Sequence, residues 1–193
     1  GLDGRYTQIL KDGMPLYGGF AGGLSIMQIP PLDLKQVELI KGSNSTLYGG
    51  GAIAGLVNLV TIQPVDAPRL DLMLNQTTAS GTTGNVFYAQ KFGKAGFSVY
   101  GSANNQKAYD PDNDGFSNMP DAQTFSLNPK MYFYFNDNTE LSLGLNTTID
   151  DRTGGDMEVV NGKPSADHIF TEENQSERYA SQLNFRNTKE KRT

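Results

Sequence analysis

The sequence predicts a mainly β chain that begins with a small α+β portion. Apolar and polar residues alternate with a period of two in several stretches between residues 69 and 186, which is typical of strands with one apolar and one wet face. Residues 37–61 read as a short strand, a helix start, three glycines and a second apolar strand. Two prolines, Pro64 and Pro68, bracket a polar linker between these patterns and predict a domain boundary there.

The segment from Val37 to Thr61 reads VELIKGSNSTLYGGGAIAGLVNLVT and contains two strands around a polar turn. Residues 43–45 are good N-caps, because their side-chain oxygens accept hydrogen bonds from the first backbone N–H groups of a helix. The glycines at 49–51 can take positive φ values and let another backbone approach. The apolar run from Gly55 to Val60 then fits a strand that is buried on both faces.

The same glycines allow a competing interpretation, a dinucleotide-binding fingerprint through Gly49, Gly51 and Gly55. That fingerprint requires a long helix next and an acidic residue about 20 positions further on, within a parallel strand–helix–strand unit. Here an extended apolar run and Gln63-Pro64 follow instead. We therefore reject nucleotide binding and expect no organic cofactor.

Composition excludes several function classes. The 193 residues carry a formal net charge of −5 and no cysteine. The basic residues do not cluster, so we expect no nucleic-acid partner. The sequence has one histidine, His168, which excludes cysteine–histidine catalysis and a clustered zinc site, and it has no Gly-x-Ser-x-Gly motif. We predict that the chain is not an enzyme and that His168 is a solvated loop residue.

The second half predicts an antiparallel sheet whose connections alternate in length. Gly93-Lys94 and residues 136–138 are short turns, whereas Ala108–Asp121 and Asp150–Ser176 are long and polar. This is the layout of outer-membrane barrels, but a soluble antiparallel sheet shows the same strand alternation. The residues of the predicted apolar face include Leu70, Leu72, Leu74, Val86, Tyr88, Phe97, Val99, Met131, Phe133, Phe135, Leu141, Leu143, Leu145, Ile149, Tyr179, Leu183 and Phe185.

The first long loop contains acidic residues in a pattern typical of calcium-binding loops. Carboxylates on alternate residues of a tight turn converge on one point, a glycine permits the bend, and a backbone carbonyl adds an oxygen. Asp121 stands where a glutamate is usual, so the pattern fits an ordinary Asp-Asn-Gly surface turn equally well. The candidate ligands are Asp110, Asp112, Asp114, the carbonyl of Phe116, and Asp121.

Three blocks of the N-terminal part, in the same order, resemble the plug domain of TonB-dependent outer-membrane receptors. Ile9–Leu16 (ILKDGMPL) is similar to the family's LIDGVPL strand and turn. Residues 29–38 are similar to its IP…IERVEV entry, and residues 43–61 to its GP.SALYG, GAIGG and VINIIT blocks. Position 43 is serine where the family usually has proline, which keeps the helix start. The resemblance implies structural roles in the plug for Lys41, Gly42, Tyr48, Gly49 and Gly55.

The resemblance implies a fragment of a plugged antiparallel transmembrane β-barrel. Residues 1–64 would be the C-terminal half of the plug, and residues 65–193 would be the first roughly six strands of the barrel, with two long extracellular loops. The intact receptor would lie in the cell outer membrane, in contact with its lipid, and would import a scarce nutrient such as a ferric siderophore or cobalamin. TonB would supply the energy through a plug segment expected outside these residues.

Two site predictions depend on this resemblance. Tyr17 and Phe20 lie in the loop after the first plug strand, which contacts substrate in the family, although both rings could equally pack under the barrel wall. Asp150 and Asp156 lie in a second acidic loop, which resembles the region that holds calcium in cobalamin receptors. A counter-charge from Arg152 is the plain electrostatic alternative for that loop.

Two other function classes stay open on the sequence, a soluble calcium-dependent β-sheet adhesion or carbohydrate-binding module and a β-sheet hydrolase. Both require a core built from the apolar strand faces. Burial of Leu141, Leu143 and Leu145 would therefore favour them, whereas exposure of these leucines favours the receptor.

Overall fold

The computed structural model describes residues 7–15, 31–41 and 55–188. The chain divides into two compact units, Gly1–Gln63 and Pro64–Thr193. Strands make up most of the described part of both units, which confirms the mainly β prediction. Across the described ranges, no helix is both long and apolar enough to cross a membrane.

The first unit contains a four-stranded sheet in the order β2-β1-β4-β3. Its strands are β1 (Thr7–Lys11), β2 (Met14–Pro15), β3 (Leu34–Lys41) and β4 (Gly55–Thr61). β1 runs parallel to β4, whereas β2 and β3 run antiparallel to their neighbours. Leu10, Leu56 and Leu59 are buried in this sheet, so the apolar run predicted as an interior strand occupies the centre of the unit.

Polar contacts fix the ends of these strands. Asp12, at φ +51°, turns the chain from β1 into β2, and its carboxylate accepts hydrogen bonds from the backbone N and the Oγ1 of Thr61 at 2.8 and 2.7 Å. Lys11 forms a 2.7 Å ion pair with Asp33. Gly55 has φ +141°, and a Cβ there would lie 2.8 Å from the Ile40 carbonyl oxygen, so only glycine fits the start of β4 without strain.

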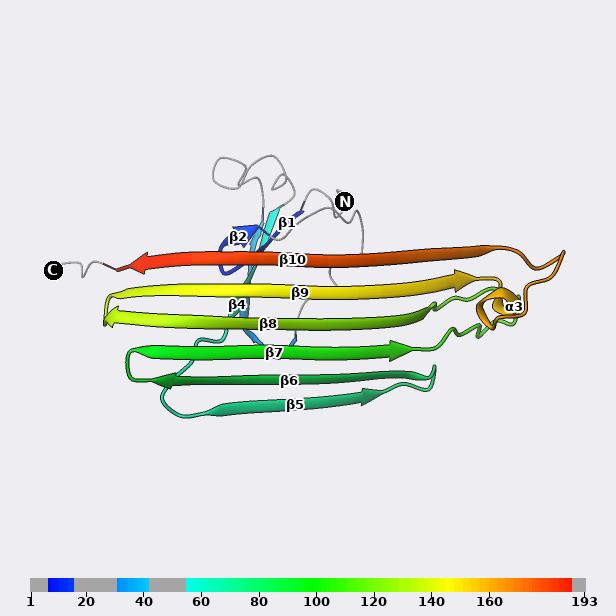
Figure 1. The fold of residues 1–193 in the computed structure, drawn as a ribbon. Coiled ribbons are helices and arrows are strands. Elements are labelled where there is room, and N and C mark those ends of the chain that lie inside the picture. The colour runs from blue at the N-terminus through cyan, green and yellow to red at the C-terminus, as the bar shows by residue number, and fades with distance from the viewer. Residues whose placement is uncertain (1–6, 16–30, 42–54, 189–193) are drawn as a thin grey trace. The chain divides into compact units, whose positions relative to one another are not determined.

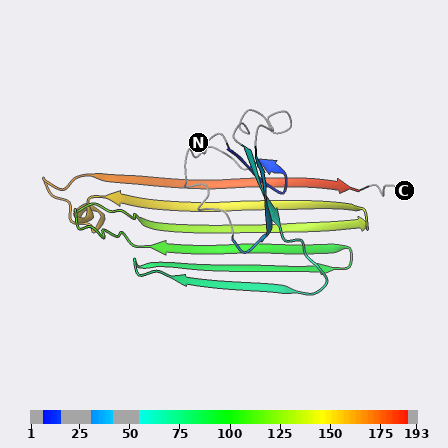
Figure 2. The same ribbon diagram turned by 180° about the vertical axis from the view of Figure 1, so that it is seen from behind.

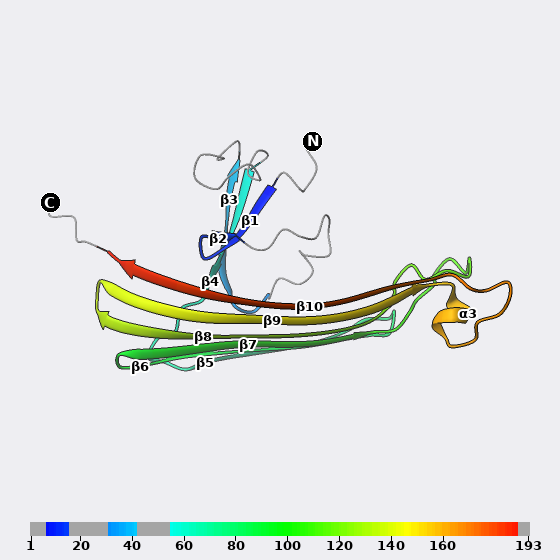
Figure 3. The ribbon, with the colours of Figure 1, turned by 45° about the horizontal axis from the view of Figure 1, so that its top comes forward.

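The second unit is a six-stranded antiparallel sheet in which each strand pairs with its neighbours in sequence (Figures 1 and 2). The order is β10-β9-β8-β7-β6-β5. The strands are β5 (Arg69–Gln76), β6 (Gly81–Phe92), β7 (Ala95–Gln106), β8 (Asp121–Asn136), β9 (Thr139–Gly155) and β10 (Thr171–Asn187). Figure 3 shows that the long strands are bent along their length.

The connections of this sheet differ between its two ends. Residues 93–94 and 137–138 are the short turns at one end, and residues 77–80, 107–120 and 156–170 connect strands at the other end (Figure 1). The last connection carries the short helix α3 (Met157–Val160). The long connections therefore meet at a single end of the sheet.

The prediction that Asp150–Ser176 is one long loop is wrong. β9 continues to Gly155, and Asp151 pairs with Gln123 of β8 on one side and Gln175 of β10 on the other. The apolar–polar alternation that predicts a strand stops at Ile149, because the residues after it are polar on both faces. The hydrogen bonds of β9 to β8 and β10 nevertheless continue to Gly155. The 17 residues of β9 extend over about 55 Å, well beyond the ~10 residues that a membrane-spanning strand needs.

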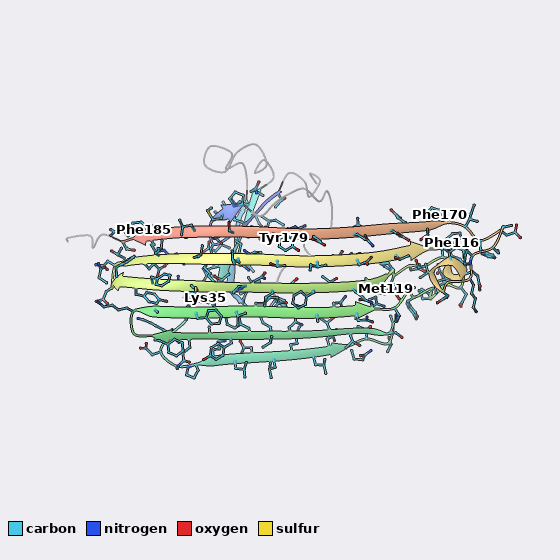
Figure 4. All side chains as sticks on the ribbon, viewed as in Figure 1. Lys35, Phe116, Met119, Phe170, Tyr179 and Phe185 are labelled. Atoms are coloured by element: carbon cyan, nitrogen blue, oxygen red, sulfur yellow. The ribbon has the colours of Figure 1, made fainter. Side chains whose placement is uncertain are left out.

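The two faces of the sheet differ in polarity. On one face Leu145 is 51% exposed, Leu143 is 42% exposed and Leu141 is half-buried, so the leucines are not the core that a soluble module requires. The opposite face carries buried polar residues such as Ser98, Ser126 and Ser142 together with the buried rings of Phe87, Tyr100 and Tyr132. The exposed apolar face comprises Leu70, Leu72, Leu74, Val86, Phe92, Phe125, Leu127, Met131, Phe133, Phe135, Leu143, Leu145, Ile149, Tyr179, Leu183 and Phe185, two of which are labelled in Figure 4.

Candidate functional site

The candidate site lies where the loops of residues 107–120 and 156–170 meet, at the α3 end of the sheet (Figures 3 and 4). A backbone hydrogen bond from Met157 N to Gly115 O at 2.9 Å joins the two loops, and a second, from Ser117 N to Gly155 O at 2.8 Å, joins the first loop to the end of β9. The rings of Phe116 and Phe170 pack edge to face, with centroids 6.3 Å apart. The two loops therefore form one continuous structure, here called the loop pair.

The first loop of the pair is closed at its base by Tyr109 and Met119, which are joined by backbone hydrogen bonds of 3.0 and 3.1 Å. Within it, Asn113 at φ +56° and Gly115 at φ +88° make the sharp bend that the sequence predicts at the glycine. The Asp110 carboxylate accepts a hydrogen bond from Gly115 N, and the Asp114 carboxylate accepts one from Phe116 N. These bonds fix two of the acidic side chains relative to the bend.

The structure brings together three of the predicted metal ligands. One carboxylate oxygen from each of Asp110, Asp112 and Asp114 lies within 4.8 Å of the other two. Asp110 Oδ1 is buried and has no hydrogen-bond partner in the structure, as expected for an oxygen available to a cation. Three carboxylates are hard oxygen donors, so the residues present fit Ca²⁺.

The predicted ligand Asp121 is not part of this cluster. Asp121 is the first residue of β8, and its carboxylate lies 3.2 Å from Lys107 Nζ. The backbone N–H of Phe116 donates to the Asp114 carboxylate, and Phe116 forms an isolated antiparallel β-bridge with Asp156. The backbone of Phe116 therefore helps to hold the two loops of the pair together.

Hydrogen bonding lowers the pKa of Asp110. Burial by itself raises that pKa, but hydrogen bonds to the carboxylate, led by the bond from Gly115 N, outweigh it and hold the pKa below the ordinary value of 3.8. The carboxylate is therefore ionised at neutral pH, which is the form that binds a cation.

Asp150 is held by an ion pair within the sheet. It is 4% exposed, lies in β9, and accepts hydrogen bonds from Arg152 Nε at 2.6 Å and from Thr124 Oγ1 at 2.6 Å. A second bond from Arg152 Nη2 at 3.1 Å makes the contact bidentate. The structure thus supports the electrostatic alternative for this residue.

Asp156 organises the second loop of the pair. Its Oδ1 accepts a hydrogen bond from Glu158 N at 2.9 Å and so caps α3, and its Oδ2 lies 2.6 Å from His168 Nδ1. The prediction of a solvated His168 is wrong for this nitrogen, although the ring is 49% exposed overall. Sequence reasoning missed the contact because the residues lie 12 positions apart in a loop whose closure has no local signal.

The lowered pKa of Asp156 predicts how the stability of the second loop depends on pH. Burial raises the pKa, but hydrogen bonds from His168 and Glu158 outweigh it, so the pKa lies below the ordinary 3.8. At pH values above the pKa of Asp156 in the unfolded chain, the ionised carboxylate stabilises the folded loop. This stabilisation is lost as the pH falls through the pKa of Asp156 in the folded state. We expect amide hydrogen exchange at Glu158 to show loss of protection below about pH 3.8. Protection that is the same in Asp156→Ala would contradict this.

The predicted substrate contacts, Tyr17 and Phe20, lie outside the described residues, as do Gly42, Tyr48 and Gly49. Lys41 and Gly55 are described, and they pair with each other across β3 and β4. This pairing agrees with a structural role for both.

Comparisons with known proteins agree with this architecture. Residues 1–56 match the family model described as TonB-dependent Receptor Plug Domain. The chain is 34% identical over 62 residues to the vitamin B12 transporter BtuB of Vibrio vulnificus (strain YJ016), which covers 32% of this chain and 10% of the transporter. The chain therefore matches a small part of that relative.

Solved structures show the same fold over most of the chain. The siderophore receptor PirA from Pseudomonas aeruginosa matches 78% of this chain and 28% of its own, with a TM-score of 0.60 and 20% identity. The ferric yersiniabactin uptake receptor FyuA from Yersinia pestis matches 77% of this chain and 23% of its own, with a TM-score of 0.62 and 21% identity. The chain thus spans about a quarter of each solved receptor.

Proposed function

This chain belongs to the family of TonB-dependent receptors, and from that premise we propose that the receptor binds a scarce nutrient outside the cell and imports it across the outer membrane. The proposed nutrient is a ferric siderophore or a cobalamin, the classes that the names of the matched relatives state. TonB is the proposed energy-coupling partner. Binding and gated passage need no bond chemistry on the nutrient.

The observation that carries the proposal is the exposed apolar face of the six-stranded sheet. One face of the sheet exposes leucine and phenylalanine, whereas the other carries serines as well as the rings of Phe87, Tyr100 and Tyr132. An exposed apolar face opposite a more polar one is the polarity of a barrel wall whose outer side contacts lipid. In water such a face would be an aggregation site. The proposed location of the sheet is therefore the outer membrane, with the loop pair on the extracellular side.

The test is nutrient uptake by cells in which this receptor is the sole route for the nutrient. We expect uptake of a radiolabelled ferric siderophore or cobalamin, and we expect it to stop when TonB is removed. Uptake that continues without TonB, or no uptake of either class, would overturn the proposal. Tyr17→Ala and Phe20→Ala test the proposed substrate contacts, for which a higher half-saturating concentration at unchanged receptor abundance is expected.

The acidic cluster is part of this proposal as a calcium site. Three converging carboxylates and the unpartnered Asp110 Oδ1 support it. A bound Ca²⁺ would offset the mutual repulsion of the three charges and hold the first loop of the pair in one conformation. The ion would thereby order the loops that meet the nutrient.

We expect calorimetry of the chain in detergent to show saturable Ca²⁺ binding that is lost in Asp112→Ala and in Asp114→Ala, since each variant removes one of three charged ligands. Asp151→Ala is the matched control, because this carboxylate lies in β9 outside the cluster. Heat of binding that is equal in Asp112→Ala and Asp151→Ala would place any calcium elsewhere.

A further inference from the structure

His168 is the only histidine of the chain, and its imidazole is fixed from one side. Nδ1 lies 2.6 Å from Asp156 Oδ2. Asp156 is itself held by the bond from Glu158 N to its other carboxylate oxygen and by a 3.0 Å bond from its own N to Phe170 O. A backbone bond of 3.0 Å from Ser165 N to His168 O anchors the histidine main chain. The imidazole is therefore pre-oriented.

The contact with Asp156 also determines which ring nitrogen of His168 carries the hydrogen. An ionised carboxylate only accepts hydrogen bonds, so Nδ1 must carry the hydrogen in the contact with Asp156. In the neutral ring the lone pair is then on Nε2, and Nε2 points away from the carboxylate because the two nitrogens lie on different sides of the ring. Metal-ligating histidines usually have a partner of this kind on the other ring nitrogen, because it fixes the tautomer and the orientation of the ring.

The surroundings indicate which kind of metal species would bind. A bare zinc ion takes about four protein ligands, whereas His168 offers one nitrogen and its carboxylate partner is already engaged on both oxygens. A metal that arrives with most of its ligands in place needs only one more. Exposed apolar side chains stand beside the histidine: Ile169 is 73% exposed, and the rings of Phe170 and Phe116, labelled together in Figure 4, are 56% and 48% exposed.

We propose that His168 Nε2 coordinates the metal of an imported planar chelate at an axial position that the chelate leaves exchangeable, with Asp156 as the positioning residue and the Phe116–Phe170 pair against the apolar part of the ligand. The inference rests on the proposed function and narrows it. It favours a corrin-type or porphyrin-type chelate over a ferric siderophore whose own donors fill all coordination positions of the iron. In the binding step a metal–water bond breaks and a metal–Nε2 bond forms, with no electron transferred.

The experiment uses two forms of one ligand. Aquocobalamin carries an exchangeable axial water, whereas cyanocobalamin keeps its cyanide and offers no open position. With the full chain in detergent micelles, we expect aquocobalamin to show a shift of its visible absorption bands on binding, and cyanocobalamin to show none. The shift should disappear in His168→Ala. Asp156→Asn should weaken the affinity for aquocobalamin by about 10-fold to 100-fold, because it removes the carboxylate behind the ring.

Controls separate coordination from loop collapse. Asp167→Asn removes the neighbouring carboxylate and should behave as the unchanged protein, and Asp156→Glu should recover part of the affinity that Asp156→Asn loses. A band shift that survives in His168→Ala would overturn the proposal. So would the absence of a shift in the unchanged protein with both aquocobalamin and ferric protoporphyrin. Either result would leave nutrient import standing if uptake still requires TonB, so the two proposals fail independently.

Discussion

Leu145→Arg is expected to destabilise the receptor in a lipid bilayer by about 2–4 kcal/mol. Leu145 lies midway along the apolar positions 141–149 of β9, and its side chain is 51% exposed. Under the proposed function that exposure is to hydrocarbon, where a guanidinium loses its hydration without gaining a partner. The measurement is equilibrium unfolding in guanidinium chloride of the receptor folded into phospholipid vesicles.

The matched control is Asn146→Arg, which places the same charge one residue further on. Successive side chains of a strand point to opposite faces, so this arginine enters the polar face of the sheet and is expected to cost a small fraction of the Leu145→Arg penalty. The pair also separates the receptor from the soluble alternative. In a water-exposed sheet, arginine at position 145 would be nearly neutral, so equal and small effects of the two variants would contradict the membrane location.

The fold could be predicted from the sequence wherever a local pattern records the environment of a residue. Alternation predicts the strands up to Ile149 because apolar side chains mark one face there. The structural role of Gly55 came from the plug-domain resemblance, and the structure explains it by the close approach to the Ile40 carbonyl. Beyond Ile149 the strand is polar on both faces, and the ladders to β8 and β10 continue through it. Those ladders depend on partners distant in sequence, which no local pattern records.

The candidate site likewise has one part that the sequence predicts and one part that depends on residues distant in sequence. The convergence of Asp110, Asp112 and Asp114 follows from their spacing around one glycine bend, which is local information. The contact between Asp156 and His168 depends on how residues 156–170 close over the end of the sheet. The role of Asp150 was ambiguous in the sequence because it depends on the local structure. In a strand, Arg152 lies on the same face as Asp150, two positions away, whereas in a loop the two side chains have no fixed relation. The strand assignment resolves that ambiguity.

Arg152→Met is expected to cost about 3–5 kcal/mol of unfolding free energy, because it leaves the 4%-exposed Asp150 carboxylate without its bidentate counter-charge. The bond from Thr124 Oγ1 remains, but a single neutral donor does not replace a guanidinium. The double variant Asp150→Leu/Arg152→Met should recover most of the loss, since it removes both buried charges together. The readout is again guanidinium unfolding of the receptor in vesicles.

The same variant decides between the two interpretations of Asp150. If Arg152 is simply its counter-charge, added Ca²⁺ leaves the instability of Arg152→Met unchanged, and the calcium affinity of the Asp110 cluster stays as it was. If Asp150 were a calcium ligand that Arg152 masks, removal of the arginine would uncover the ligand, and millimolar Ca²⁺ would restore the lost stability. We expect no restoration, because Asp150 and its partners Arg152 and Thr124 all lie within β8 and β9, and Asp150 is not among the carboxylates that converge at the bend of the first loop.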